Sequence, residues 1–575
     1  MTHRYDLVIR GGTLADGTGA PIREADVAVE DGRIAAVGRI EGSGREEIEA
    51  KGLLVTPGFV DIHTHYDGQA TWDDRLQPSS WHGVTTAVMG NCGVGFAPVR
   101  PKDHDRLIEL MEGVEDIPGA ALHEGLDWSW ESFPDYLGRL GACRYDIDIC
   151  AQLPHGALRV FVMGERGARL EAATDDDIAE MRRLTGEAMR AGAIGFSTSR
   201  TLNHRTVKGD PTPSLRATEA ELAGIALGLK DAGSGVFEMI SDFEDQAAEF
   251  AMIRRLVEMS GRPLSLSLGQ SHRDPEGWRR LLGRIGEAAR DGLEIRAQVA
   301  PRPIGTLYGL QSSANPFSTH PSFRAIADKP LAEKVAALRD PEFRARLLAE
   351  MPAGHPATVK RLSDFSRIFP LGEQPDYEPS RERSVAAMAA QQGREPADLV
   401  CDLLIEDEGR AFLFAPFSNY ALYNLDACGE MMRDPNTVMG LGDGGAHVGL
   451  ISDASFTTYL LSHWGRDRAH GRLPLETLVK KQTADTARAV GLFDRGIVAP
   501  GMKADLNVID FDRLAVERPS MAFDLPAGGK RLLQRARGYE ATIVSGAVTY
   551  RNGEAMDALP GRLVRGAQSA PATAS

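Results

Sequence analysis

The sequence predicts an α/β protein built on a (β/α)8 TIM-like barrel, and two observations support this prediction. Apolar, β-branched runs recur along the middle of the chain, and most segments between them have helical periodicity and end in glycine. Several of these runs also end in side chains of the kind that bind metals or substrates. Barrels of this class hold their sites at the carboxyl ends of the strands, so the two observations agree.

Eight runs qualify as barrel strands. In chain order they cover residues 53–67, 83–89, 146–156, 193–199, 234–241, 263–272, 293–303 and 437–445. Helical segments such as 175–192 and 247–261 lie between them. Because strands that alternate with helices form parallel βαβ units, residues 56–490 are expected to form the barrel.

The two ends of the chain have a different pattern. Residues 1–55 and 491–555 consist of short alternating apolar and polar runs, separated by turn signals such as Gly-Gly and Asp-Gly. Neither end is large enough to bury much surface alone. We therefore expect the N- and C-terminal segments to pair into one small β-sandwich beside the barrel.

The interval between the seventh and eighth strands is much longer than an ordinary loop. The barrel's own helix is expected within residues 384–405, and residues 305–385 are expected to form an inserted lid or subdomain over the strand ends. The tail, residues 556–575, is small and polar at its end and is expected to be disordered.

Composition excludes several classes of function. The chain has 575 residues and a net charge of −16, and its basic residues are scattered, which argues against nucleic-acid binding. No apolar run is long enough to span a bilayer, and the N-terminus lacks a secretory signal. Five cysteines without CxxC spacing indicate a reducing compartment, so a cytoplasmic location is expected. An acidic barrel of this size is often a homo-oligomer, a state that the sequence leaves open.

The first strand ends in the motif His63-Thr64-His65. Residues two apart on a strand share a face, so both imidazoles are expected to project together as ligands for Zn²⁺. Polar side chains also end other predicted strands: Cys92 the second, His155 the third, His272 the sixth and Asp443 the eighth. This recurrence at one end of a barrel predicts a metal site.

Such a site predicts a reaction class. Zn²⁺ with an open coordination position lowers the pKa of bound water to about 7 and polarises a carbonyl. Asp443 is best placed to accept the proton of that water and pass it to a leaving nitrogen. The sequence therefore predicts metal-assisted hydrolysis of an amide or similar acyl bond in a small-molecule substrate.

The motif around His63, PGFVDIHTH, and the segment GIVAPGMKADLNVID at 496–510 resemble the amidohydrolase superfamily. The segments GVTTAVMGNCG (83–93), GAIGFSTS (192–199) and LGDGG (441–445) resemble the D-aminoacylases, the N-acyl-D-amino-acid deacylases. The resemblance implies one or two metal ions held by the ligands listed here: His63, His65, Cys92, His272 and Asp443. It implies Asp443 as the catalytic aspartate, and it gives His155 either a substrate-facing or a structural role.

The fifth strand departs from that family, which has a histidine where this chain has Ile240. Glu238 and Asp242 are oxygen alternatives, or they simply form ion pairs. The site is then expected to centre on His63, His65 and Asp443. His272 also lies slightly late in its strand.

A free N-acyl amino acid carries a carboxylate, so a guanidinium is expected to face it. Arg200 and Arg302 follow the fourth and seventh strands and are the candidates. Chirality is not fixed by the sequence. Two other functions stay open: hydrolysis of a cyclic amide, lactone or dipeptide on the same scaffold, and a metal-free barrel that acts as a binding or assembly protein.

Overall fold

The computed structural model describes residues 4–572 and contains a barrel of eight parallel strands. In spatial order these are β6 (Phe59–Asp61), β7 (Val84–Met89), β8 (Asp148–Pro154), β9 (Gly195–Arg200), β10 (Val236–Ser241), β11 (Leu264–Ser267), β12 (Ile295–Val299) and β16 (Thr437–Met439). A parallel bridge between Thr64 and Gly444 joins the first strand's extension to the last, which brings the ring to closure. The predicted (β/α)8 fold is confirmed.

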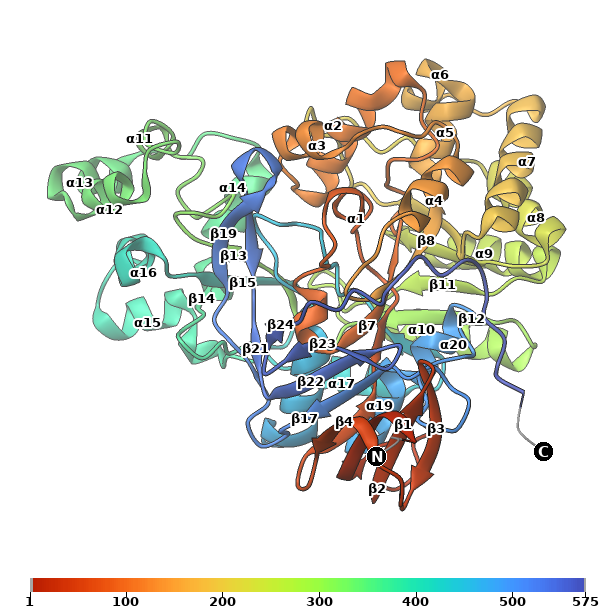
Figure 1. The fold of residues 1–575 in the computed structure, drawn as a ribbon. Coiled ribbons are helices and arrows are strands. Elements are labelled where there is room, and N and C mark those ends of the chain that lie inside the picture. The colour runs from red at the N-terminus through yellow and green to blue at the C-terminus, as the bar shows by residue number, and fades with distance from the viewer. Residues whose placement is uncertain (1–3, 573–575) are drawn as a thin grey trace.

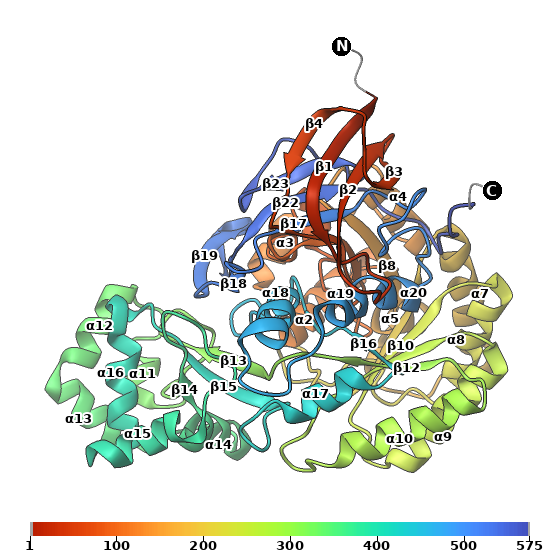
Figure 2. The same ribbon diagram turned by 90° about the horizontal axis from the view of Figure 1, so that it is seen from below.

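Helices lie outside the strands, and α7–α10 follow one another along one flank (Figures 1 and 2). They are α7 (Asp175–Ala191), α8 (Glu219–Ala232), α9 (Gln246–Ser260) and α10 (Gly277–Arg290). Local sequence sets the ends of α7: Thr174 and Asp177 form a capping box at its start, and Gly192 takes a left-handed φ of 113° at its end. These signals explain why the segments between strands could be recognised as helices.

The two chain ends form one nine-stranded sheet beside the barrel. The N-terminal part gives β1 (Tyr5–Leu14), β2 (Arg23–Glu30), β3 (Arg33–Gly38), β4 (Gly44–Glu49) and β5 (Leu54–Pro57); the C-terminal part gives β17 (Leu506–Ile509), β22 (Tyr539–Val544), β23 (Ala547–Arg551) and β24 (Glu554–Ala555). Strand β5 connects the two parts, since it pairs with β1 on one side and β17 on the other. A hairpin of β19 (Ser520–Leu525) and β20 (Gly529–Leu533) lies outside this sheet.

A lobe is inserted between β12 and β16, and it stands to one side of the barrel (Figure 1, green to teal). It contains β13 (Ile304–Tyr308), β14 (Phe369–Pro370), β15 (Leu413–Ser418), α11 (Pro321–Arg324), α12 (Leu331–Arg339), α13 (Pro341–Ala349), α14 (Pro356–Ser363), α15 (Val385–Gln392) and α16 (Pro396–Gly409). Its own apolar core runs from Tyr308 to Ala415 and includes Val385 and Val400. The lobe therefore extends beyond the predicted boundary at residue 385.

The barrel helix predicted within residues 384–405 is corrected for the same reason. Helices α15 and α16 bury their apolar side chains in the core of the lobe. The helix that packs against β12 and β16 is α17 (Asp426–Arg433), which places Met431 and Met432 in the main core. A periodic apolar pattern shows that a helix is buried, but not against which core.

The prediction of a disordered tail is wrong for residues 556–572. Gly561 pairs with Tyr145 and Leu563 pairs with Ile149, which lies in barrel strand β8. Leu563 and Val564 are each 7% exposed, so an apolar pair anchors the segment despite its small, polar surroundings. Residues 573–575 lie outside the described residues. Within residues 4–572, no helix is long and apolar enough to cross a membrane.

Candidate metal centre

Three predicted ligands meet at the carboxyl ends of β6 and β7. The ligand atoms of His63, His65 and Cys92 all lie within 4.8 Å of one another, and the three residues are buried. The Sγ of Cys92 is 3.3 Å from the Nε2 of His63. Cys92 has a φ of 55°, an uncommon backbone conformation that turns the chain directly after β7. Two imidazoles and a thiol are the donors that Zn²⁺ prefers, so the residues present fit this ion.

Asp443 follows β16, the last strand of the barrel, and it faces the two histidines that follow β6, the first strand. Its Oδ1 is 3.3 Å from the Nε2 of His63 and 3.6 Å from the Nε2 of His65. Its backbone N–H donates to the carbonyl of His63 at 3.0 Å, which fixes the loop after β16 against the first strand. Burial alone would raise the pKa of Asp443, but its contact with His65 and the proximity of His63 lower that pKa below its usual range.

The imidazole of His63 is held from behind, because its Nδ1 is 2.8 Å from the Oε1 of Gln298 on β12. A partner of this kind fixes the ring orientation of a metal-binding histidine. The Nδ1 of His65 lies 3.3 Å from the Oε1 of Glu115 but forms no hydrogen bond within residues 4–572. Burial lowers the pKa of His65 to about 4, so the ring is neutral near pH 7 and can act as a ligand.

Strand β10 contributes a carboxylate instead of an imidazole. Glu238 is 1% exposed, and its Oε2 accepts a hydrogen bond from the backbone N–H of Cys92 at 3.1 Å. Its Oε1 is buried and has no hydrogen-bond partner among residues 4–572. Asp242 lies elsewhere, because its carboxylate binds the hydroxyl of Thr201 and the backbone of Leu202. Of the two oxygen alternatives to the histidine missing at Ile240, Glu238 is therefore the one beside the cluster.

The assignment of His272 as a ligand is corrected. Strand β11 ends at Ser267, and the chain then runs along the lobe: the N–H of Gln270 donates to the Asn419 side chain, and Ser271 pairs with Ser418 at the end of β15. The charged groups that influence His272 are Arg367 and Asp364 of the lobe, not the groups of the cluster. The sequence indicated this outcome, because His272 stands at the very end of its predicted strand.

His155 also has a structural position. It is fully buried, its Nδ1 is 2.8 Å from the Thr198 hydroxyl, and its Nε2 is 2.9 Å from the Oε1 of Glu221. Both ring nitrogens are therefore occupied within the protein. The substrate-facing alternative for His155 finds no support in this geometry.

The two arginines expected at the substrate are both paired with carboxylates. The Nε of Arg200 is 2.6 Å from Glu249, and its Nη1 donates to the carbonyl of Ala217. Arg302 is 2% exposed, and its Nη2 is 2.5 Å from the Oδ1 of Asp453. We correct both assignments, since neither guanidinium is free to meet a carboxylate from solvent.

Four residues near the cluster were not identified from the sequence: Glu115, His204, Gln298 and His447. Glu115 is 1% exposed and lies between His65 and His447, whose Nε2 is 3.5 Å from its Oε2. His204 follows β9, and its Nδ1 is 2.9 Å from the Ser199 hydroxyl. Only His447 has a sequence signal, because it stands four residues after Asp443 in the same loop.

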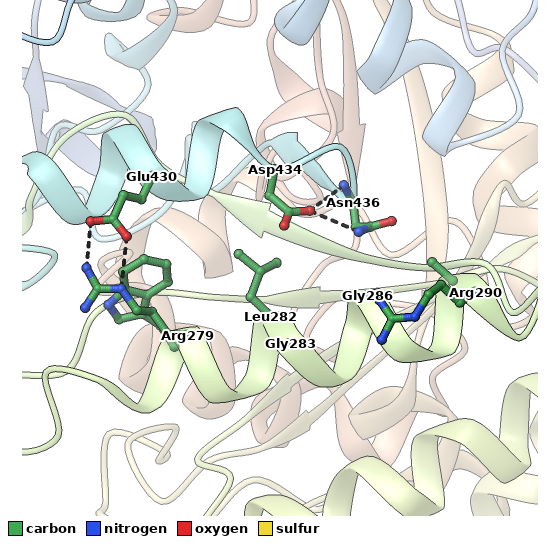
Figure 3. A pocket seen from close by; sticks show the side chains of 10 residues that line it. Arg279, Leu282, Gly283, Gly286, Arg290, Glu430, Asp434 and Asn436 are labelled. Atoms are coloured by element: carbon green, nitrogen blue, oxygen red, sulfur yellow. Dashed lines mark hydrogen bonds and ion pairs between the residues drawn. The ribbon is translucent and has the colours of Figure 1, made fainter.

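A separate groove of about 650 Å³ lies away from the cluster, between α10 and α17 (Figure 3). Arg279 and Glu430 form an ion pair at one end of it, and Asp434 binds Asn436 farther along. None of its lining residues belongs to the cluster. The chemistry therefore lies at the strand ends and not in this groove.

Comparison with known proteins agrees with this geometry. A model of the amidohydrolase family matches residues 46–550. The D-aminoacylase of Alcaligenes xylosoxydans xylosoxydans is 28% identical over 553 residues, which cover 95% of each chain. The N-acyl-D-aspartate deacylase of the same organism is 27% identical over 510 residues, covering 88% of this chain and 86% of the relative.

Solved structures show the same likeness. A structure of D-aminoacylase, in work on the role of its binuclear metal centre, has a TM-score of 0.65 at 26% identity, covering 98% of this chain and 100% of that chain. The N-acyl-D-glutamate deacylase of Bordetella bronchiseptica, solved with zinc and a phosphonate inhibitor, has a TM-score of 0.64 at 24% identity and shares the fold. The matched family model spans most of the sequence and includes every residue of the cluster. The chain belongs to the amidohydrolase family.

Proposed function

We propose that this amidohydrolase removes the acyl group from N-acyl-D-amino acids. The observation that supports this most directly is the cluster of His63, His65, Cys92 and Asp443 at the carboxyl ends of the barrel strands. The likeness to D-aminoacylase along 95% of the chain supports the substrate class. A hydrolase of a cyclic amide, lactone or dipeptide is the alternative outcome of the test below.

The residues of the cluster would divide the work as follows. His63, His65, Cys92 and Asp443 would hold Zn²⁺. The ion would supply a water of pKa about 7 and would polarise the acyl carbonyl. Asp443, in contact with both imidazoles, would accept the proton of that water and return it to the leaving nitrogen. Gln298 keeps the ring of His63 oriented, and the burial of the cluster limits access of bulk water.

The donor set supports one ion rather than two. A second ion would need further histidine ligands. Strand β10 has Ile240 in the place of one such histidine, and His272 lies against the lobe. Glu238 is the remaining nearby donor, with one buried oxygen unpartnered. We propose a single tightly held ion, and metal analysis of protein purified without chelators should give close to one equivalent.

The test combines metal content with a substrate panel. The panel contains N-acetyl-D- and N-acetyl-L-amino acids, dipeptides, cyclic imides and lactones. Turnover of the D-acids above the L-acids is expected. Exclusive turnover of a cyclic or dipeptide substrate would replace the proposed substrate, and a metal-free protein without turnover would favour the binding role.

Variants separate the site from the scaffold. His63→Ala and Asp443→Asn should each lower kcat by roughly 10²-fold or more, because general acid–base catalysis alone contributes 10²–10⁴-fold. The matched control is His272→Ala, a histidine that lies against the lobe and outside the cluster, and it should keep full activity. Retained activity in Asp443→Asn would contradict the mechanism.

The setting of the enzyme is part of the same proposal. All five cysteines are free, which supports a reducing location such as the cytoplasm. The buried cluster favours a small-molecule substrate over a macromolecule. A homo-oligomer is proposed, and light scattering coupled to size-exclusion chromatography would show a single copy if this is wrong.

A further inference from the structure

Two histidines lie in loops beside the metal cluster that follow barrel strands on opposite sides of the ring. His204 lies in the loop after β9 and His447 in the loop after β16, and these two strands stand four positions apart in the ring of eight. Burial lowers the pKa of His204, and the proximity of His447 and then of His65 lowers this pKa further. His447 likewise influences His65 and Asp443. Both imidazoles therefore lie within electrostatic reach of the cluster.

Each ring is held through one nitrogen, and its other nitrogen is left over. The Nδ1 of His204 is 2.9 Å from the Ser199 hydroxyl, and the Nε2 of His447 is 3.5 Å from Glu115. The Nε2 of His204 and the Nδ1 of His447 form no hydrogen bond within residues 4–572. Neither atom is among the polar atoms that are both unpartnered and fully shielded from solvent. Each ring can therefore donate or accept one further hydrogen bond.

The backbone fixes both rings next to the ligands. A side chain on Gly93, next to Cys92, would come within 3.0 Å of the backbone nitrogen of Ser199, so the loop of the thiol packs directly on the partner of His204. His447 has a φ of 49°, and its carbonyl accepts hydrogen bonds from Leu450 and Ile451. A non-glycine residue keeps such a conformation only where its surroundings determine it.

The loop of His447 is also pinned from outside. Asp116 accepts from the backbone of Gly449 at 3.2 Å, and Leu532 of the β19–β20 hairpin donates to the carbonyl of Val448 at 2.6 Å. Leu307 of the lobe donates to the carbonyl of Leu450, also at 2.6 Å. Three separate parts of the chain thus hold the backbone that follows His447 in place.

The substrate of the proposed reaction carries a carboxylate, and the two arginines expected to face it are engaged. Arg200 pairs with Glu249 and Arg302 with Asp453. We propose that His204 and His447 together hold the carboxylate of the N-acyl amino acid, each donating a hydrogen bond through its remaining ring nitrogen. This inference rests on the proposed function, and it names the residues that would make the enzyme selective for free acids.

The test compares each N-acetyl-D-amino acid with its primary carboxamide, which keeps the scissile amide and removes the charge. For wild type, kcat/KM is expected to favour the acid. His204→Ala and His447→Ala should each lower this acid-to-carboxamide preference by about 10- to 100-fold, because a hydrogen bond to a charged group contributes about 1.5–3 kcal/mol. The loss should lie in KM, and metal content should not change.

Two further variants complete the design. His447→Asn tolerates the left-handed backbone and keeps an N–H, so it should recover part of the preference even if His447→Ala folds poorly. His123→Ala, an exposed histidine on α3 (Gly119–Gly125), is the matched control and should leave the preference unchanged.

The possible failures are distinguishable. If wild type hydrolyses the acids and both variants lose acid and carboxamide turnover equally, or lose neither, the inference is wrong while the proposed function stands. If wild type hydrolyses carboxamides but not acids, both are wrong. Loss of metal in the variants would make the histidines ligands instead of carboxylate contacts, and would also overturn the inference.

Discussion

Replacing Arg302 with methionine distinguishes a structural arginine from a substrate-binding one. In the structure its guanidinium lies 2.5 Å from Asp453 and 3.0 Å from the Ser455 hydroxyl, and it stacks 4.1 Å from the ring centre of Tyr377. Both members of the ion pair are almost fully buried. Arg302→Met would leave the Asp453 carboxylate buried without its partner.

Removing one partner of a buried ion pair costs about 3–5 kcal/mol, so Arg302→Met should lower the free energy of unfolding by that amount. The double variant Arg302→Met/Asp453→Asn should regain most of the loss, because no buried charge remains. Arg200→Met is the control: its pair with Glu249 is partly exposed, and about 1 kcal/mol or less is expected.

The assay is urea unfolding followed by tryptophan fluorescence, with steady-state kinetics of each variant normalised to folded protein. KM for free acids and for their carboxamides should shift together, if at all. A variant of normal stability whose KM rises only for the acids would refute the structural role and restore Arg302 to the substrate.

Three more outcomes follow from the structure. Cys92→Ser should weaken metal binding, and the thiolate-to-metal absorption of the Co²⁺-loaded protein should disappear; an unchanged spectrum would remove Cys92 from the ligands. Although burial raises the pKa of Glu378, its bonds with His463 and Arg468 lower it to about 2. Because this lies below the usual 4.5, the carboxylate stabilises the fold above pH 4.5 and this contribution is lost as pH falls toward 2. Glu378→Gln should therefore cost roughly 2 kcal/mol at pH 7, after allowance for solvent screening, and much less at pH 3, as measured by chemical unfolding at both values. Deleting residues 556–575 should lower Tm in differential scanning calorimetry, and an unchanged Tm would show that the buried segment contributes no stability.

The barrel and four of its site residues could be predicted from sequence because each rests on a local pattern. The periodicity of apolar residues and the turn signals define the strands, and because the strands are parallel, their carboxyl ends come together. His63, His65, Cys92 and Asp443 lie within four residues of those ends, so their meeting required little knowledge of loop paths.

The remaining site residues depend on paths that no local pattern records. Glu115 stands at the end of α2 (His104–Glu115), which carries no spacing signal toward the first strand. His272 lies five residues beyond its strand, where contacts with the lobe redirect the chain. For Arg200 and Arg302, sequence gives position but not partner, and the partners Glu249 and Asp453 decide their roles.

The anchoring of the loop after β16 couples the outer parts of the chain to the site itself. Asp443 and His447 lie in this one loop, which is tied to the inserted lobe, the β19–β20 hairpin and Asp116. A change in any of these outer segments can therefore reach Asp443 as well as His447. Exchange of the lobe among relatives would then alter the rate of the reaction together with the choice of substrate.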